Sequence, residues 1–167
     1  KSTKNDANDA RAVAVAALRS PQLAAVRVED HVTILRLLAK AQLDTSRAKS
    51  RACCRLHALV AELVPGGIRK EIVVKQAEQI LVDIVATSAA QRQRLDLAYD
   101  TLSEIIMLDE RAKRNRARMI SEVLASGTSL TGIFGIGPII AATLIGYTGD
   151  IHRFPTAGHY AAYNGTA

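Results

Sequence analysis

The chain has 167 residues, of which 49% are hydrophobic and only 4% aromatic, and its 22 Lys and Arg against 16 Asp and Glu give a net charge of +6 at pH 7. This composition favours packed helices over sheets, and no run of about twenty apolar residues is present to cross a membrane, so we expect a mainly α, cytoplasmic protein. The positive charge indicates a polyanionic partner, with nucleic acid as the leading candidate.

The first predicted helix lies near the start of the chain. The polar residues Asn5-Asp6-Ala7-Asn8-Asp9 mark its start, and strong helix formers follow over residues 10–18. Ser20-Pro21 ends the helix. A short extended piece could follow over residues 24–28. Glu29-Asp30 then supplies acidic residues for the start of a long helix that runs to about Leu63.

This long helix has an apolar face and a separate basic stripe when each residue is advanced by about 100°. The stripe contains Arg36, Lys40, Arg47, Arg51 and Arg55. Pro65-Gly66-Gly67 breaks the helix, and a second long helix is predicted from about Arg69 to Glu110. Two long helices joined by a tight turn predict an antiparallel hairpin, a coiled-coil arm.

Such an arm is too long to be covered within a compact domain of this size. Projecting arms usually cover their apolar faces with each other and with a partner chain, although no strict heptad is present here. We therefore expect a homo-oligomer formed through the arm.

The charge changes sign abruptly at the predicted end of the second helix. Acidic residues there give way to a basic run made of Arg111, Lys113, Arg114, Arg116 and Arg118. Two interpretations stay open: a solvated helix face, or cations that contact nucleic-acid phosphates.

A glycine turn, Gly135-Ile136-Gly137, follows between two apolar segments. Glycine lets backbone N–H groups approach a phosphate, and the positive end of the next helix points to the same place. The pattern predicts a small helical module with a helix-hairpin-helix-like grip on the DNA backbone, in which Gly135 and Gly137 bind phosphates. The alternative is a glycine hinge that lets two core helices pack closely.

Two carboxylates near the start of the chain, Asp6 and Asp9, lie three residues apart and share a helix face. Nucleases and recombinases use such pairs to hold the divalent cations that activate the attacking oxygen and stabilise the leaving one. The alternative is an ordinary helix start, where the same residues cap the first turn.

The chain resembles the insertion-sequence transposases of the IS-one-ten type. The resemblance extends over essentially the whole chain and is most specific at its end, where the following motifs occur in order: Gly135-Ile136-Gly137-Pro138, Gly149-Asp150-Ile151-His152-Arg153-Phe154 and Ala162-Tyr163-Asn164-Gly165. At the front it includes Lys4-Asn5-Asp6-Ala7-Asn8-Asp9-Ala10-Arg11. Phe134 departs from the pattern, because relatives more often have a proline there.

The resemblance implies three parts. Residues 1–22 would end a RuvC-like catalytic domain, residues 23–110 would form the helical coiled-coil hairpin, and residues 111–167 would begin a transposase domain. Asp6 and Asp9 would be the last two of four acidic ligands for Mg²⁺ or Mn²⁺. The partners implied are DNA, a guide RNA and further copies of the chain.

The resemblance further implies that the two other acidic residues lie upstream of Lys1 and that a nucleophilic serine lies downstream of Ala167. We therefore expect an internal fragment that is inactive alone, from a transposase that cuts and rejoins DNA strands. Two rivals stay open. One is a non-enzymatic helix-hairpin-helix module that binds DNA and dimerises. The other is a helical scaffold that binds protein through its apolar arm and does not bind nucleic acid.

Overall fold

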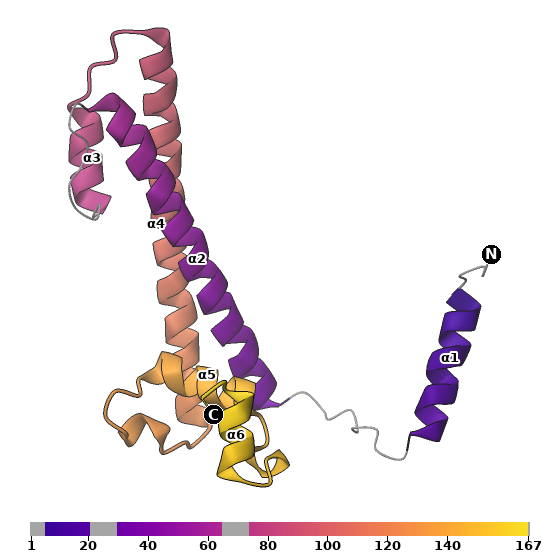
Figure 1. Cartoon of the computed structure of the whole chain (residues 1–167). Coiled ribbons are helices and arrows are strands. Elements are labelled where there is room, and N and C mark those ends of the chain that lie inside the picture. Colours follow the sequence, from indigo (N-terminus) through magenta and orange to yellow (C-terminus); the bar gives the residue numbers. More distant parts are fainter. Residues whose placement is uncertain (1–5, 21–29, 65–73, 167) are drawn as a thin grey trace.

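The computed structural model describes residues 6–20, 30–64 and 74–166, and every regular element in these ranges is a helix (Figure 1). The prediction of a mainly α fold is confirmed for this part of the chain. The extended piece predicted at residues 24–28 and the break at Pro65-Gly66-Gly67 lie outside the described residues. The elements are α1 (Asp6–Arg19), α2 (His31–Leu63), α3 (Val74–Val82), α4 (Ala89–Ala125), the 3-10 helix η1 (Leu130–Gly132), α5 (Pro138–Thr148), the 3-10 helix η2 (Ile151–Arg153) and α6 (Ala157–Tyr163).

The first helix, α1, forms where the sequence predicts one. It begins at Asp6, has Asp6 and Asp9 in its first turn, and ends at Arg19, just before Ser20-Pro21. None of its residues is buried, and it stands apart from the other helices in Figure 1. The described residues therefore include no core that covers α1.

The second helix, α2, also has the predicted bounds. Asp30 precedes it in an extended conformation, and its carboxylate accepts hydrogen bonds from the backbone N–H groups of Val32 (3.0 Å) and Thr33 (3.3 Å). This cap satisfies two of the N–H groups that have no partner within a helix. Leu63 ends the helix.

The second long helix of the prediction is wrong in its extent. Two helices replace it: α3 ends at Val82, and α4 begins at Ala89 and continues past Glu110 to Ala125. The break has a local cause, because the Ser88 hydroxyl accepts a hydrogen bond from Gln91 N (3.2 Å), and the Gln91 side chain accepts one from Thr87 N (2.8 Å). This reciprocal pair caps a new helix. The domain boundary predicted between residues 110 and 111 falls inside α4 and stays a prediction.

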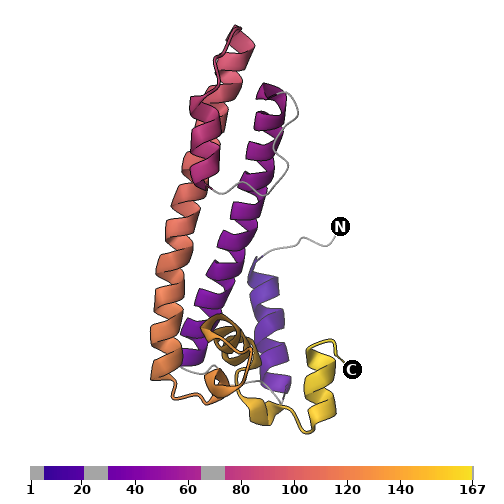
Figure 2. The same cartoon turned by 90° about the vertical axis from the view of Figure 1, so that its left-hand side faces the viewer.

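The long helices α2 and α4 lie side by side along most of their length (Figures 1 and 2). Contacts between them run in opposite directions along the two helices: Asn115 of α4 meets Leu38 of α2, and Arg94 of α4 meets Glu62. The pair is therefore antiparallel. At about 1.5 Å per residue, helices of 33 and 37 residues span about 50 Å and 55 Å.

Two separate hydrophobic clusters hold this pair together. The upper cluster joins α2, α3 and α4, and the lower cluster joins α2, α4 and α5. The buried members of the upper cluster are Ala52, Leu56, Val60, Leu63, Ala77, Leu81, Ala98, Leu102 and Ile105. Those of the lower cluster are Leu35, Ala39, Met119, Val123, Ala141 and Ala142. Thr45 and Asn115, two of the buried polar residues, lie in the stretch between the clusters.

The C-terminal helices are anchored at the lower end of the pair through α5. Gly146 lies so close to α2 that a Cβ atom there would be 2.6 Å from the backbone nitrogen of Arg36. The Arg36 Nε in turn donates a 2.6 Å hydrogen bond to the carbonyl oxygen of Gly146. A cation at the last turn of α5 also suits the negative end of the helix dipole.

Candidate nucleic-acid interface

Three of the five cations of the basic run line one pocket between α2 and α4. Arg111, Arg114 and Arg118 follow one another at spacings of three and four residues, which keeps them within about 60° of arc on the helix. With Ala41 and Thr45 of α2 and Asn115 of α4 they surround a cavity of about 260 Å³. We call it the arginine pocket.

The polar side chains of Thr45 and Asn115 at this pocket already have partners. Thr45 is only 3% exposed, and its hydroxyl donates to the carbonyl oxygen of Ala41 (2.7 Å). The Asn115 amide nitrogen donates to the carbonyl oxygen of Leu38 and to the Gln42 side chain, both at 3.0 Å. The charged donors of the lining are therefore the three guanidinium groups, which have no acceptor atoms of their own.

Carboxylates pair with cations elsewhere along the two helices. Three ion pairs, each 2.5 Å long, join α2 to α4 in the direction of the upper cluster: Lys49–Asp109, Arg55–Glu104 and Arg94–Glu62. Within the ranges that the structure describes, no ion pair involves the three arginines of the pocket. Carboxylates in the acidic half of α4 thus neutralise cations of α2. The pocket arginines in the basic half of α4 have no such partner among the described residues.

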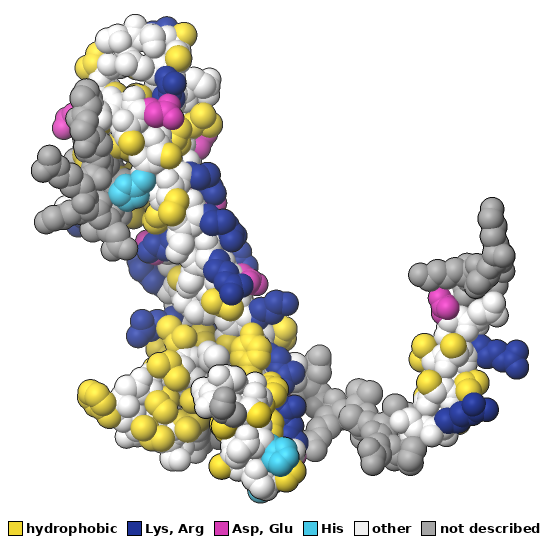
Figure 3. Space-filling view, in the orientation of Figure 1, with side chains coloured by type: hydrophobic (Ala, Val, Ile, Leu, Met, Phe, Trp, Pro, Cys, Tyr) yellow, Lys and Arg dark blue, Asp and Glu magenta, His cyan; other side chains and the backbone are white. Residues whose placement is uncertain are grey.

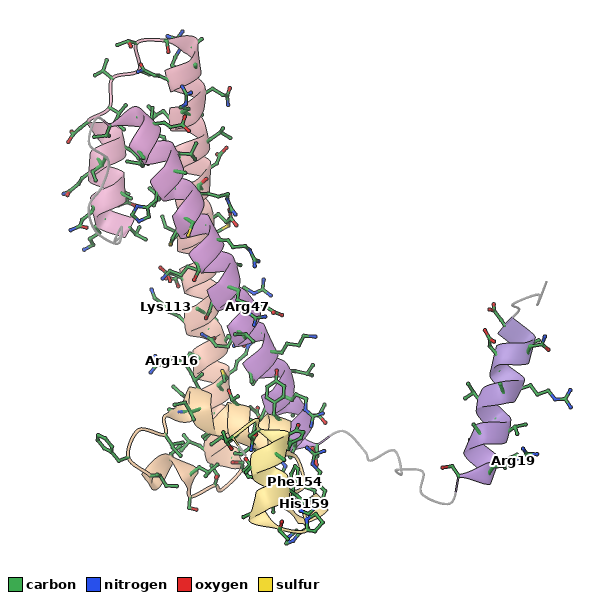
Figure 4. The ribbon with its side chains drawn as sticks, viewed as in Figure 1. Arg19, Arg47, Lys113, Arg116, Phe154 and His159 are labelled. Carbon is green, nitrogen blue, oxygen red and sulfur yellow. The ribbon has the colours of Figure 1, made fainter. Side chains whose placement is uncertain are left out.

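The remaining two cations of the basic run lie elsewhere on α4. Lys113 forms a 2.6 Å ion pair with Glu110, and the hydrogen bond and the charge of Glu110 raise the pKa of Lys113. Arg116 lies about 200° around the helix from Arg114. Figure 4 shows Lys113 and Arg116 on the same side of α4, away from α2. The structure therefore brings three members of the run together and separates two.

The basic stripe of α2 is exposed, and Figure 3 shows cationic side chains following the visible length of that helix. Arg36 contacts Gly146 and Arg55 pairs with Glu104, so two of its members serve the packing of the chain. Residues 31–48 and 111–125 together hold eight Lys and Arg against two Asp and Glu. The lower half of the helix pair is strongly positive.

The predicted glycine turn leads into α5. Ile136 N donates a 3.0 Å hydrogen bond to Ile133 O, and Gly135 has a φ of +85°. Since no described residue other than glycine has a positive φ, this is a type II turn with glycine at its third position. Phe134 is fully exposed at the second position, where proline is favoured in such turns.

The two glycines of the turn differ in backbone conformation. Gly135 requires its positive φ, whereas Gly137 has an ordinary φ of −81° and open space where a Cβ would lie. Gly137 precedes Pro138 at the start of α5, and no side chain caps that end. The close approach of two helices, offered as the alternative role of this turn, occurs instead at Gly146.

Asp6 and Asp9 are both exposed in the first turn of α1. Two carboxylates at this spacing fit two of the oxygen ligands of a divalent cation. No group of three or more metal-binding side chains occurs among residues 6–20, 30–64 and 74–166. The metal-ligand role of Asp6 and Asp9 therefore stays a prediction.

An aromatic cluster that the sequence analysis did not single out connects α5, η2 and α6. The Arg153 guanidinium lies 4.5 Å from the ring centre of Phe154 and 4.6 Å from that of Tyr163. The Tyr163 hydroxyl donates to Tyr147 O (2.9 Å), and the hydroxyls of Tyr160 and Thr148 are 2.9 Å apart. Figure 4 labels Phe154 within this group. These contacts fix the last helices against α5.

The fold and the site define a helical protein with a cationic pocket suited to a polyanion. No helix in the described ranges combines the length and the apolar character that a membrane span requires. Residues 127–167 match the family model described as Transposase IS116/IS110/IS902 family. No curated protein and no solved structure matches the chain. The family match supports an insertion-sequence transposase of the type that the motifs resemble.

The matched segment has a clear structural counterpart. It begins two residues after the end of α4 and contains the glycine turn, α5, η2 and α6. The arginine pocket and the long helices lie outside it. The matched helices are nevertheless attached directly to the lower, basic half of the helix pair through α5.

Proposed function

We propose that this chain is part of a DNA transposase that cuts and rejoins DNA strands by metal-assisted phosphoryl transfer under the guidance of an RNA. The observation that carries the proposal is the transposase family match over residues 127–167. The arginines of the pocket beside the matched helices support it, because they form no ion pair with a described carboxylate and a polynucleotide is the polyanion on which a transposase acts.

In this proposal the matched helices and the arginine pocket contact phosphates of the DNA backbone. Gly135 and Gly137 would present backbone N–H groups at the start of α5, where the helix dipole favours negative charge. Arg111, Arg114 and Arg118 would add cations from α4. Contacts of this kind position a protein on DNA and do not depend on base sequence.

Asp6 and Asp9 would supply two carboxylate ligands to Mg²⁺ or Mn²⁺, with the other ligands coming from beyond the described residues. A bound divalent metal neutralises the phosphate and activates the attacking oxygen. The role of the two aspartates would be to hold that metal beside the strand that is cut.

The outer face of α2 would contact a second polynucleotide strand. Lys40, Arg47 and Arg51 are exposed there, and no described carboxylate forms an ion pair with them. They lie on the side of α2 opposite its buried residues. Guide RNA or a further stretch of DNA would follow this face.

The helical arm would also join copies of the chain. Tyr99, Ile106 and Ile120 lie on the same face of α4 at multiples of seven residues, with Lys113 at the position between the two isoleucines, and each of the three apolar side chains remains between 37% and 39% exposed. Leu124 continues this face and is 73% exposed. A second copy packed along it would cover these side chains as the seam of a coiled coil does.

The test is strand cleavage and rejoining by the full-length protein that contains this chain, with the element DNA, its RNA and Mg²⁺. We expect Asp6→Asn or Asp9→Asn to reduce the rate at least about a hundredfold while DNA binding is kept, because a metal-assisted reaction depends on its ligands. Asp44→Asn, on an exposed part of α2, is the matched control. Metal-independent DNA binding without cleavage would favour the non-enzymatic module instead.

A further inference from the structure

We propose that the arginine pocket is a discrete binding site for one phosphate group, carried by a polynucleotide strand that passes over the pocket on the surface of α2 and α4. The identity of the polymer rests on the proposed function, whereas the phosphate site does not.

The pocket lies between the two hydrophobic clusters of α2 and α4. Thr45 and Asn115 occupy this stretch, and both are buried with their hydrogen bonds made. Buried, satisfied side chains give the site a fixed floor. The three arginines beside these residues all belong to α4, so one continuous helix holds the three cations in place.

The size and the chemistry of the pocket select a small anion. Its volume of about 260 Å³ is below the range of about 300–1,000 Å³ that is usual for sites that enclose small organic ligands. Guanidinium groups donate in a planar fork that matches the oxygens of phosphate. The charge and the donors of the pocket therefore match a phosphate group, and an apolar compound has no such match.

The three arginines also repel one another while the pocket is empty of anions. They lie three and four residues apart on one helix, a spacing at which like charges destabilise the helix. No described carboxylate relieves this repulsion by an ion pair. A phosphate bound among them would remove it, so binding should raise the melting temperature of the chain.

The experiment is thermal denaturation of the 167-residue chain in millimolar inorganic phosphate, with chloride at the same ionic strength as the reference. Phosphate should raise the melting temperature in a saturable way. Arg114→Gln should weaken the apparent phosphate affinity by about tenfold or more, because it removes a charge-assisted hydrogen bond. Arg116→Gln changes the charge by the same amount on the other side of α4, and should leave the phosphate effect unchanged.

Removal of a repelling charge should not unfold the chain, so Arg114→Gln should melt in chloride at or slightly above the temperature of the original sequence. An absent phosphate effect, or equal effects in the Arg114→Gln and Arg116→Gln variants, would overturn the site. Equal effects in the two variants would mean that phosphate raises the melting temperature because it is excluded from the protein surface in general, and not because it binds at the pocket.

Competition then identifies the polymer. Short oligothymidylates with and without a 5′ phosphate should displace inorganic phosphate from the pocket. Equal competition by both assigns the site to internal phosphodiesters, and competition by the phosphorylated form alone assigns it to a strand end. If neither oligonucleotide displaces phosphate, the pocket is an anion site and the polynucleotide assignment is wrong. Failure of the strand-cleavage test would leave the phosphate result intact.

Discussion

Arg36 and Gly146 fix the C-terminal helices to the lower end of α2. The Arg36 Nε donates to Gly146 O at 2.6 Å, and the missing side chain of Gly146 lets α5 approach the α2 backbone at the same residue. One contact therefore provides both a hydrogen bond at the end of α5 and the close fit of two helices. Through it the matched transposase segment is held beside the arginine pocket.

Substitution of Gly146 by alanine should destabilise the chain. The new Cβ would lie 2.6 Å and 2.7 Å from backbone atoms of Arg36, which cannot move aside as a flexible side chain would. Overpacking of this kind costs about 1–3 kcal/mol. The free energy of unfolding, measured by urea denaturation followed by circular dichroism, should fall by that amount.

Gly132→Ala is the matched control, because open space surrounds the position of its Cβ and its φ is not positive. It should leave stability unchanged or raise it by a few tenths of a kcal/mol, about the size of a favourable entropy effect. Equal stability of the two variants would contradict the close approach of α5 and α2.

Asn115→Ala should weaken the contact between α2 and α4. The side chain is buried and links Leu38 and Gln42 of α2 through its amide nitrogen. Its loss leaves the Gln42 oxygen without this donor and opens a small cavity, at a cost of about 1–2 kcal/mol. Urea denaturation measures the loss, and Arg116→Ala on the exposed side of α4 should change stability by less than about 0.5 kcal/mol.

Ile106→Glu combined with Ile120→Glu should separate copies of the chain. Both side chains are partly exposed on the face of α4 that we assign to oligomer formation. Two acidic side chains would replace apolar contacts of the seam, and their desolvation would cost free energy. Light scattering coupled to size-exclusion chromatography should report a smaller mass than for the original sequence, with circular dichroism unchanged. A monomeric original chain would refute this assignment.

Much of the helical framework follows from local sequence. Asp30 marks the start of α2, and the apolar spacing of that helix predicts which side is buried. The break between α3 and α4 also has a local signal, the Ser88-Ala89-Ala90-Gln91 capping pattern, which competes with a long apolar face across it. Apolar periodicity alone predicted one continuous helix where α3 and α4 are separate. The change of charge suggested that this helix ends at Glu110, whereas α4 continues to Ala125.

The site is less predictable because it depends on pairing across helices. The basic run identifies five cations, but only the register of α2 against α4 determines that Arg111, Arg114 and Arg118 line a pocket while Lys113 and Arg116 lie elsewhere. In the same way, Gly146 has no local feature that distinguishes it from other helical glycines, because its partner is Arg36, far away in the sequence. Long-range packing decides such roles.

The most direct test of the account is binding of a labelled single-stranded oligonucleotide to the 167-residue chain over a range of salt concentrations, followed by fluorescence anisotropy. Replacing Arg111, Arg114 and Arg118 together by glutamine should lower the slope of log affinity against log salt by about 0.7, the contribution of the one phosphate contact that the pocket makes with a single strand. The same replacement of Arg19, Lys75 and Arg92, which do not line the pocket, should leave the slope nearly unchanged. Absence of binding by the original chain at low salt, or equal slopes for the two triple variants, would contradict a polynucleotide site between α2 and α4.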